Sequence, residues 1–278
     1  MNTQSGEKFP LSLTSDFLSD TGCAEGDLRA LAAAGFTHVH WCHQWNTDFL
    51  YGRAEMEQIG RWLEEFGLKL PDLHGSAGRE KCWWSQREYE RLAGVELVEN
   101  RLRMTAQLGG NVVVMHVPAL KEGEEKTWEQ LRRSMDSLVT TIRGLGVRLA
   151  IENMRDDDFG MIRRLLEAYG PEVVGVCYDC GHGNIGARRG LEYLEAVKER
   201  LIALHLHDND GTRDQHGVPF TGTVDFPQLM SLVARSGYRG CITLESNVKS
   251  LDEAARATFL GDAYRTAERL RGMVVETR

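Results

Sequence analysis

The sequence predicts an α/β fold, a (β/α)8 TIM barrel that forms a single domain over residues 1–278. Two observations favour it: eight unbroken apolar runs rich in β-branched residues recur along the chain, and segments with helix start and stop signals separate them. Unbroken runs are typical of strands buried on both faces, as a parallel sheet covered by helices requires. Eight strand–helix repeats in 278 residues suit a closed barrel. The expected strands lie at residues 9–13, 37–41, 68–73, 111–117, 148–151, 173–178, 201–206 and 241–244.

The segments between these runs carry the helix signals. Asp27 precedes an apolar pattern that stops at Gly35, Asp158 is expected to cap a helix that ends before residue 170, and Asp225 opens another that runs to residue 237. Three sequences that fit a capping box begin at Ser85, Thr127 and Ser250. An open, doubly wound sheet is the alternative architecture. The lack of a G-x-G-x-x-G motif after the first run disfavours it.

Composition and charge narrow the class of protein. The chain is 42% hydrophobic and 27% charged, which is ordinary for a globular protein. No run approaches the ~18 apolar residues of a membrane-spanning helix, and the first ten residues lack the apolar core of a secretion signal. Six irregularly spaced cysteines indicate reduced thiols. We therefore expect a cytoplasmic protein without a membrane partner, and the net charge of −8 argues against general nucleic-acid affinity.

Six consecutive strands of the expected barrel end in side chains of types that bind metals. The third to eighth strands end, in order, at His74, His116, Glu152, Asp179, the pair His205 and His207, and Glu245. The carboxyl ends of barrel strands converge on one mouth, where such barrels keep their active sites. A single polar strand end indicates a capped or solvated group more often than a ligand. Six in consecutive strands indicate a shared metal site.

Charge gives this site a physical reason. Glu152, Asp179 and Glu245 would lie close together, and like charges at short range cost free energy unless a proton or a cation neutralises them. Carboxylate and imidazole ligands favour Zn²⁺ or Mn²⁺, with Co²⁺, Ni²⁺ or Mg²⁺ as alternatives, over Ca²⁺. The loop after the seventh strand adds Asp214 and His216, which are either solvated turn residues or further ligands.

Six motifs between residues 151 and 245 point to a family. The chain carries Ile-Glu-Asn at 151–153, Tyr-Asp-Cys-Gly-His at 178–182, His-Leu-His-Asp-Asn at 205–209, Asp-Gln-His at 214–216, Gly-Thr-Val-Asp-Phe at 222–226 and Thr-Leu-Glu at 243–245. Together they resemble the xylose-isomerase-like TIM-barrel superfamily, which includes sugar phosphate isomerases and epimerases and the endonuclease IV type of AP endonuclease (family 2). The motifs are specific for the superfamily but not for one reaction within it.

The resemblance to the ketose epimerases of this superfamily implies one divalent ion held from four strands. The implied ligands are Glu152, Asp179, His207 and Glu245. His205 lies on the same strand face as His207, so the choice between these two stays open. The resemblance also implies that His182 touches the substrate or the metal. These epimerases place an arginine on the ketose, for which Arg213 is only a poor positional match.

The endonuclease IV branch is the alternative, and its three-zinc cluster uses further ligands. The matching positions are His74, His116, His182, Asp214 and His216, which leaves a multinuclear site open. The chain departs from that branch in the loops that contact DNA, where it reads His-Gly-Ser-Ala at 74–77 and His-Val-Pro-Ala at 116–119. We therefore do not expect a nucleic-acid partner.

The resemblance and the ligand pattern together predict a divalent-metal-dependent isomerase or epimerase of a sugar or sugar phosphate. In this mechanism the ion polarises a substrate carbonyl, and Glu152 and Glu245 exchange a proton at the neighbouring carbon through a cis-enediolate. The alternatives are a multinuclear-zinc phosphodiesterase and a sugar-binding barrel without catalysis. The expected partner is a small-molecule sugar or sugar phosphate, and association into a homo-oligomer is left open.

The roles of two further groups of side chains are each open to two interpretations. Trp45 and four other aromatic residues near the second and third strand ends either stack on a sugar or pack against neighbouring helices. His38 and His40 share one face of the second strand and are interpreted as core or lining histidines rather than ligands.

Overall fold

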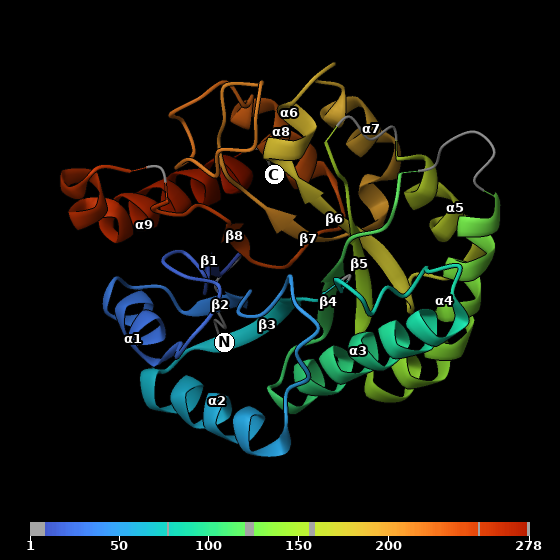
Figure 1. Cartoon of the computed structure of the whole chain (residues 1–278). Coiled ribbons are helices and arrows are strands. Elements are labelled where there is room, and N and C mark those ends of the chain that lie inside the picture. Colours follow the sequence, from blue (N-terminus) through green and yellow to red (C-terminus); the bar gives the residue numbers. More distant parts are fainter. Residues whose placement is uncertain (1–8, 77, 120–124, 156–158, 250, 277–278) are drawn as a thin grey trace, which may run out of the picture.

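A computed structural model describes residues 9–76, 78–119, 125–155, 159–249 and 251–276 of the chain (Figure 1). Eight parallel strands form a nearly closed barrel, with helices between them. Neighbouring strands pair in the order β7-β6-β5-β4-β3-β2-β1-β8. Across the remaining seam, an isolated parallel bridge between Leu206 and Leu244 joins the segments that end β7 and β8. The (β/α)8 TIM-barrel prediction is confirmed.

All eight predicted strands are present, and no boundary differs from the prediction by more than two residues. The strands are β1 (Leu11–Thr14), β2 (His38–Trp41), β3 (Lys69–His74), β4 (Val112–Met115), β5 (Arg148–Glu152), β6 (Val174–Asp179), β7 (Leu201–His205) and β8 (Ile242–Leu244). Nearly every residue in them is buried. Burial on both faces is what makes each strand an unbroken apolar run, and this is why the sequence marks the strands so clearly.

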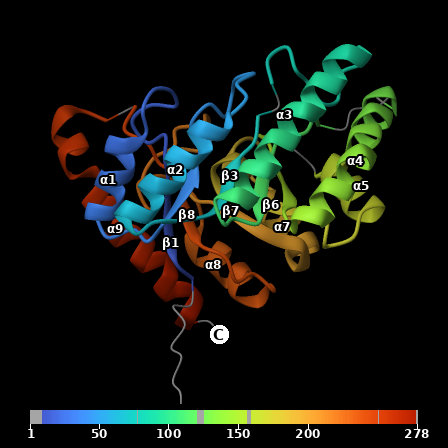
Figure 2. The same ribbon diagram turned by 90° about the horizontal axis from the view of Figure 1, so that it is seen from below.

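The helices lie around the strands, as Figure 1 and the perpendicular view in Figure 2 show. They are α1 (Glu25–Ala33), α2 (Arg53–Phe66), α3 (Glu88–Gln107), α4 (Glu125–Leu145), α5 (Gly160–Ala168), α6 (Cys180–Asn184), α7 (Gly190–Val197), the 3-10 helix η1 (Lys198–Arg200), α8 (Phe226–Arg235) and α9 (Glu253–Glu276). The sequence analysis identified no start or stop signal for α2, α6 or α7, although the predicted alternation implies a helix after each strand. No helix within the described ranges is both long and apolar enough to cross a membrane.

The predicted helix starts are less accurate than the strands. Asp225 does cap α8, since its side chain accepts the backbone N–H of Gln228. Asp27 is not a cap, because it lies within the first turn of α1, where its negative charge still suits the helix N-terminus. The expected caps Asp158 and Ser250 lie outside the described residues.

Two of the predicted capping boxes are wrong. Helix α3 begins at Glu88, and the Ser85 hydroxyl instead accepts the N–H of Arg87 and donates to the carboxylate of Glu90. Helix α4 already includes Glu125, so Thr127 lies inside the helix. A capping motif has only local information, whereas the point at which a chain leaves the barrel mouth depends on the tertiary packing of the preceding loop.

The inward face of the strands changes from apolar to polar along the barrel axis. A small apolar cluster contains Val112, Val114, Ala150, Cys177 and Ala203. Side chains two residues apart share a strand face. Two residues after each of the last four members, on the same inward face, the strand or its extension carries a polar side chain. These positions are His116, Glu152, Asp179 and His205. The same periodicity that closes the floor of the barrel therefore aims a ring of acids and imidazoles into its mouth.

Candidate metal centre and active site

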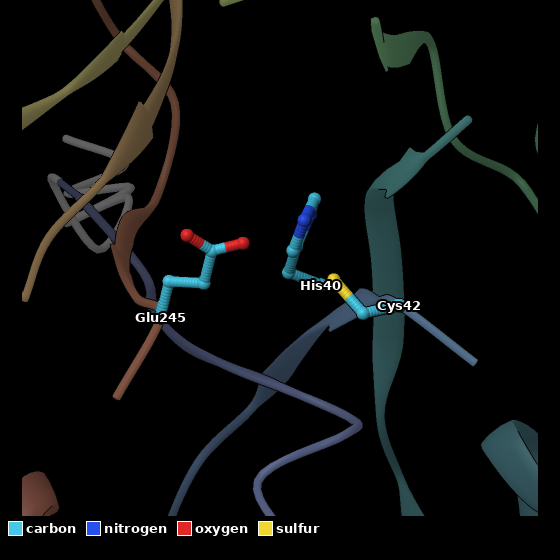
Figure 3. Close-up of side chains that lie close together, drawn as sticks. All are labelled: His40, Cys42 and Glu245. Carbon is cyan, nitrogen blue, oxygen red and sulfur yellow. The ribbon is translucent and has the colours of Figure 1, made fainter. Parts of the chain in front are cut away.

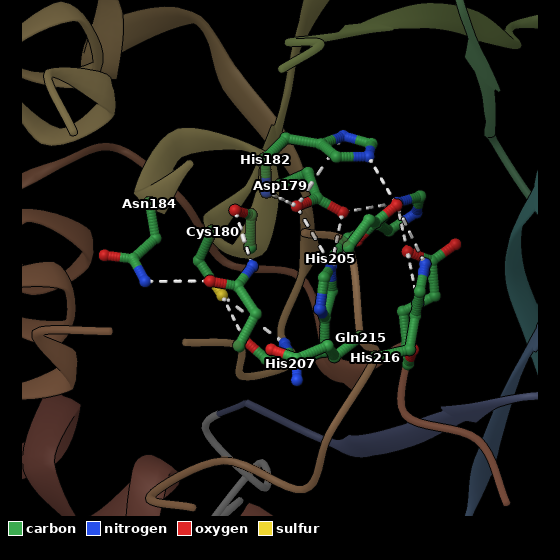
Figure 4. A network of polar contacts seen from close by, with 12 residues as sticks. Asp179, Cys180, His182, Asn184, His205, His207, Gln215 and His216 are labelled. Atoms are coloured by element: carbon green, nitrogen blue, oxygen red, sulfur yellow. Dashed lines mark hydrogen bonds and ion pairs between the residues drawn. The ribbon is translucent and has the colours of Figure 1, made fainter. Parts of the chain in front are cut away.

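The barrel mouth brings together all ten side chains that the sequence analysis assigned to a metal or substrate site. The set is His74, His116, Glu152, Asp179, His182, His205, His207, Asp214, His216 and Glu245, and imidazole–carboxylate contacts below 4 Å connect all of its members. Part of this network is drawn in Figure 4. The ten side chains divide into three groups that could each hold an ion.

The central group consists of Glu152, Asp179, His205 and Glu245. One ligand atom from each of these four lies within 4.8 Å of the others. His205 Nδ1 is 3.3 Å from Glu152 Oε2 and 3.4 Å from Glu245 Oε2. The pairing of Asp179 with His205 between β6 and β7 places these two side chains at one level. Four strands thus supply one carboxylate or imidazole each to a common point.

A second group forms around the same Glu152 carboxylate. His74 Nε2 and His116 Nε2 lie 3.3 Å and 3.2 Å from the same oxygen, Glu152 Oε2. His74 Nδ1 is 2.8 Å from the carbonyl oxygen of Gly75, so Nδ1 carries the proton and Nε2 is left with a lone pair. Such an outer hydrogen bond is how proteins orient a histidine that binds a metal.

The third group lies on the loop side of the mouth. His182 Nε2 and His216 Nε2 are 3.1 Å and 3.3 Å from Asp214 Oδ2. Outer contacts fix both rings, since His182 Nδ1 donates to the carbonyl oxygen of Asn153 and His216 Nδ1 donates to that of Glu245. His207, Asp214 and His216 also have ligand atoms within 4.8 Å of one another.

The two histidines of β7 and its extension occupy different places. His205 belongs to the central four-residue group, whereas His207 Nε2 lies 3.1 Å from both carboxylate oxygens of Asp179 and its ring stacks on His216. A Cβ on Gly181 would lie 1.9 Å from the His207 ring, so only glycine lets α6 approach that ring. That His207 is the fourth ligand stays a prediction, and the geometry favours His205.

The orphaned polar atoms show that this donor set fits a cation. Both ring nitrogens of His205 are buried without a hydrogen-bond partner among the described residues, as are His207 Nδ1 and Asp214 Oδ1. An unpaired buried polar atom costs about 1–3 kcal/mol. Carboxylates and imidazoles aimed at common points are the ligands that Zn²⁺ and Mn²⁺ use.

Asp208, which the sequence analysis did not assign, holds the loop that carries the third group. Its carboxylate accepts the backbone N–H groups of Asn209, Gly222 and Val224, and its backbone pairs with that of Gly217. These contacts fold residues 206–225 back over the mouth. Asp208 therefore positions Asp214 and His216 without belonging to any of the candidate metal groups.

Comparison with known proteins assigns the chain to a family. The family model described as "Xylose isomerase-like TIM barrel" matches residues 28–263. The chain belongs to this family. An uncharacterised protein, y4fM, from Sinorhizobium fredii is 30% identical over 90% of this chain and 89% of its own length.

Two other relatives carry names that describe sugar chemistry. An inosose isomerase from Halalkalibacterium halodurans is 23% identical over 48% of this chain and 52% of its own length. The crystal structure of a D-tagatose 3-epimerase-like protein superposes with a TM-score of 0.77 over 96% of this chain and 98% of that one, at 17% identity. The chain thus shares its fold with proteins whose names describe sugar isomerases and epimerases.

The surroundings shift the pKa values of the three acids of the central group in opposite directions. Burial raises the pKa of Glu245 well above its usual range, and the charges of Glu152 and Asp179 raise it further. Burial opposes ionisation of the other two carboxyls as well, but facing imidazoles outweigh it, so the pKa of Glu152 is well below its usual range and that of Asp179 falls to about 2. Without a cation, protons on one acid and on imidazoles must balance the buried charge.

A buried pair lies beneath the centre: His40 is a lining histidine, as the sequence analysis expected, and Asp72 is the partner that it missed. His40 Nδ1 lies 2.7 Å from Asp72 Oδ1, and its Nε2 is buried without a partner in the part of the chain that the structure describes. The His40 ring is 4.6 Å from that of His205, and Figure 3 shows it facing Glu245 beside Cys42. The signal was present, since His40 and Asp72 both occupy inward positions, but neither belongs to a recognisable motif.

A cavity of about 450 Å³ opens onto one side of the centre. Its lining combines the ligand candidates Asp214, His216 and Glu245 with Trp45 and polar side chains from three loops. The centre of the Trp45 ring also lies 4.8 Å from that of the His74 ring. Of the aromatic residues near the mouth, Trp45 therefore lies where a substrate would bind. Trp83, by contrast, is fully buried in the core.

Proposed function

We propose that this protein is a divalent-metal-dependent isomerase or epimerase of a sugar or sugar phosphate, in which Glu245 and Glu152 transfer the proton. The observation that carries the proposal is the central group: four strand ends place Glu152, Asp179, His205 and Glu245 within 4.8 Å of one another. Glu245 also lines the cavity. The sugar-directed names of the family relatives support the same class of substrate.

The two carboxylates differ in their access to a substrate. A divalent ion held by the central group would polarise a substrate carbonyl and make the adjacent C–H more acidic. Glu245, whose side chain is 12% exposed, reaches the cavity and would take or return this proton. Glu152 is 1% exposed and remains the proposed partner for the opposite face. Trp45 would exclude water from one wall.

Proton exchange with the solvent tests this proposal. Protein loaded with Zn²⁺ or Mn²⁺ is incubated in D₂O with a panel of ketoses and ketose phosphates, and deuterium at the carbon beside the carbonyl is followed by NMR. We expect exchange by the wild type and a loss of about 10²–10⁴-fold in Glu245→Gln. The control Glu195→Gln, at an exposed ion pair on α7, should exchange normally. Full exchange by Glu245→Gln, or none by the wild type on any ketose, would overturn the proposal.

A multinuclear-zinc phosphodiesterase of the endonuclease IV type is the second candidate, and the sharing of Glu152 favours it. Glu152 Oε2 faces His74 and His116 as well as His205, so the central and second groups could hold two ions bridged by one carboxylate. The group around Asp214 offers a third position. Two or three ions could together activate a water and clamp a phosphodiester.

Metal stoichiometry separates the two candidates. About one ion per chain supports the isomerase, and two or three support the hydrolase. Cleavage of duplex DNA that contains an abasic site, measured on the same preparation, then decides whether a multinuclear centre acts on DNA.

A further inference from the structure

Two cationic side chains line the cavity beside the acidic centre. Arg213 and Lys249 are both exposed, and both contribute to the same cavity wall as Asp214 and Glu245. Within the described residues, neither the Arg213 guanidinium nor the Lys249 ammonium forms an ion pair with a carboxylate below 4 Å. Elsewhere on the surface such pairs are common, as between Arg189 and Glu192.

The position of these cations follows from the loops that build the centre. Arg213 immediately precedes Asp214 on the β7–α8 loop, and Lys249 lies four residues after Glu245 on the segment that follows β8. The loops that supply acids to the candidate metal groups thus also supply positive charge to the cavity. Apart from Asp214 and Glu245, the acid that lines the cavity is Asp16, which accepts a hydrogen bond from Thr14 at the β1 edge.

The rest of the cavity wall suits a hydroxylated molecule. Thr14, Gln215 and Asn247 present hydroxyl and amide groups, while Trp45 offers an apolar face. The volume of about 450 Å³ accommodates a small sugar together with one charged substituent. A substrate that binds in this cavity beside Glu245 therefore also has the two cations among the side chains that line its site.

We propose that the substrate carries an anionic group, a phosphate or a carboxylate, and that Arg213 and Lys249 bind this group and set the specificity. This inference rests on the proposed sugar isomerase or epimerase function and names its substrate class. Arginine and lysine are the residues that proteins use for phosphate and carboxylate, and their hydrogen bonds to such anions are charge-assisted.

Matched ligand pairs test the inference by calorimetry on metal-loaded protein. The pairs are D-fructose with D-fructose 6-phosphate, D-ribulose with D-ribulose 5-phosphate, and D-glucose with D-glucuronate. We expect the anionic member of at least one pair to bind tenfold or more tightly. In the double variant R213Q/K249Q this ratio should fall to about one, with binding of the neutral sugar unchanged. The phosphate and carboxylate pairs reveal which anion is preferred.

The control double variant is K198Q/R235Q. It removes the same charge from cations that both pair with Glu195, near the opposite end of the barrel, and should keep the ratio. Equal binding within every pair, or an anion preference that survives R213Q/K249Q, would overturn the inference, because the ion itself would then be the anion site. Tight anion binding that depends on the two cations but brings no proton exchange in D₂O would instead overturn only the proposed reaction.

Discussion

Glu152 is the residue on which the contacts of the mouth converge. Its oxygen Oε2 faces His74, His116 and His205, and its oxygen Oε1 faces His182 at 3.2 Å. A fully buried carboxylate with four imidazole neighbours is held as an anion, which suits a ligand shared between ions. The same crowding leaves Glu245 as the acid of the central group that lines the cavity.

Exchange of the two β7 histidines discriminates between the alternatives for the fourth ligand. We expect His205→Gln to weaken binding of Zn²⁺ by more than about 100-fold, because it removes a member of the central group. His207→Gln should weaken it by only about 10–100-fold, since this ring orients Asp179. Competition against a chromophoric chelator measures both affinities. The opposite order would restore His207 as the ligand that the family resemblance implies.

The buried His40–Asp72 pair provides a second prediction at this scale. Asp72 holds the ring that packs on His205, so Asp72→Asn should lower the affinity for the metal by about 10–100-fold with no loss of a direct ligand. The control Asp262→Asn changes an exposed acid on α9. Equal affinity in both variants would show that the pair only fills the barrel interior.

At the scale of elements, the short helix α6 depends on one residue without a side chain. In Gly181→Ala the new methyl would overlap the His207 ring, so we expect weaker metal binding and a fall in stability of about 1–3 kcal/mol. Gly144→Ala in α4 meets nothing within 4 Å and should be neutral or stabilising by up to about 1 kcal/mol. Urea unfolding of both variants measures the difference, and an unchanged Gly181→Ala would contradict the packing described for α6.

The elements also show how far sequence reasoning reaches. Strands buried on both faces could be predicted because their whole length is apolar, and the ligand candidates because they follow those runs directly. The choice between His205 and His207 could not be made, since both point inward and only the pairing of β6 with β7 sets their level. Asp208 and Asp72 were missed because their roles depend on partners that are distant in the sequence.

For the molecule as a whole, the centre concentrates negative charge within a chain that is already at −8. A cation that binds only the folded state should therefore stabilise it, by about 2.7 kcal/mol at a free concentration 100 times the Kd. We expect treatment with a chelator to lower Tm by about 5–10 °C and added Zn²⁺ or Mn²⁺ to restore it. Scanning calorimetry makes the comparison. A Tm that does not respond to either treatment would argue against a structural contribution from the ion.

The seam between β7 and β8 connects ion binding at the centre with closure of the barrel. Only a short run of backbone contacts closes the cylinder there, from Leu206 to Thr243 and from Glu245 back to Leu206. His205 and Glu245 lie on opposite sides of this seam, and both belong to the central group. An ion between them would link the ends of β7 and β8. The amides of Leu206 and Glu245 should therefore exchange with deuterated solvent more quickly after the ion is removed.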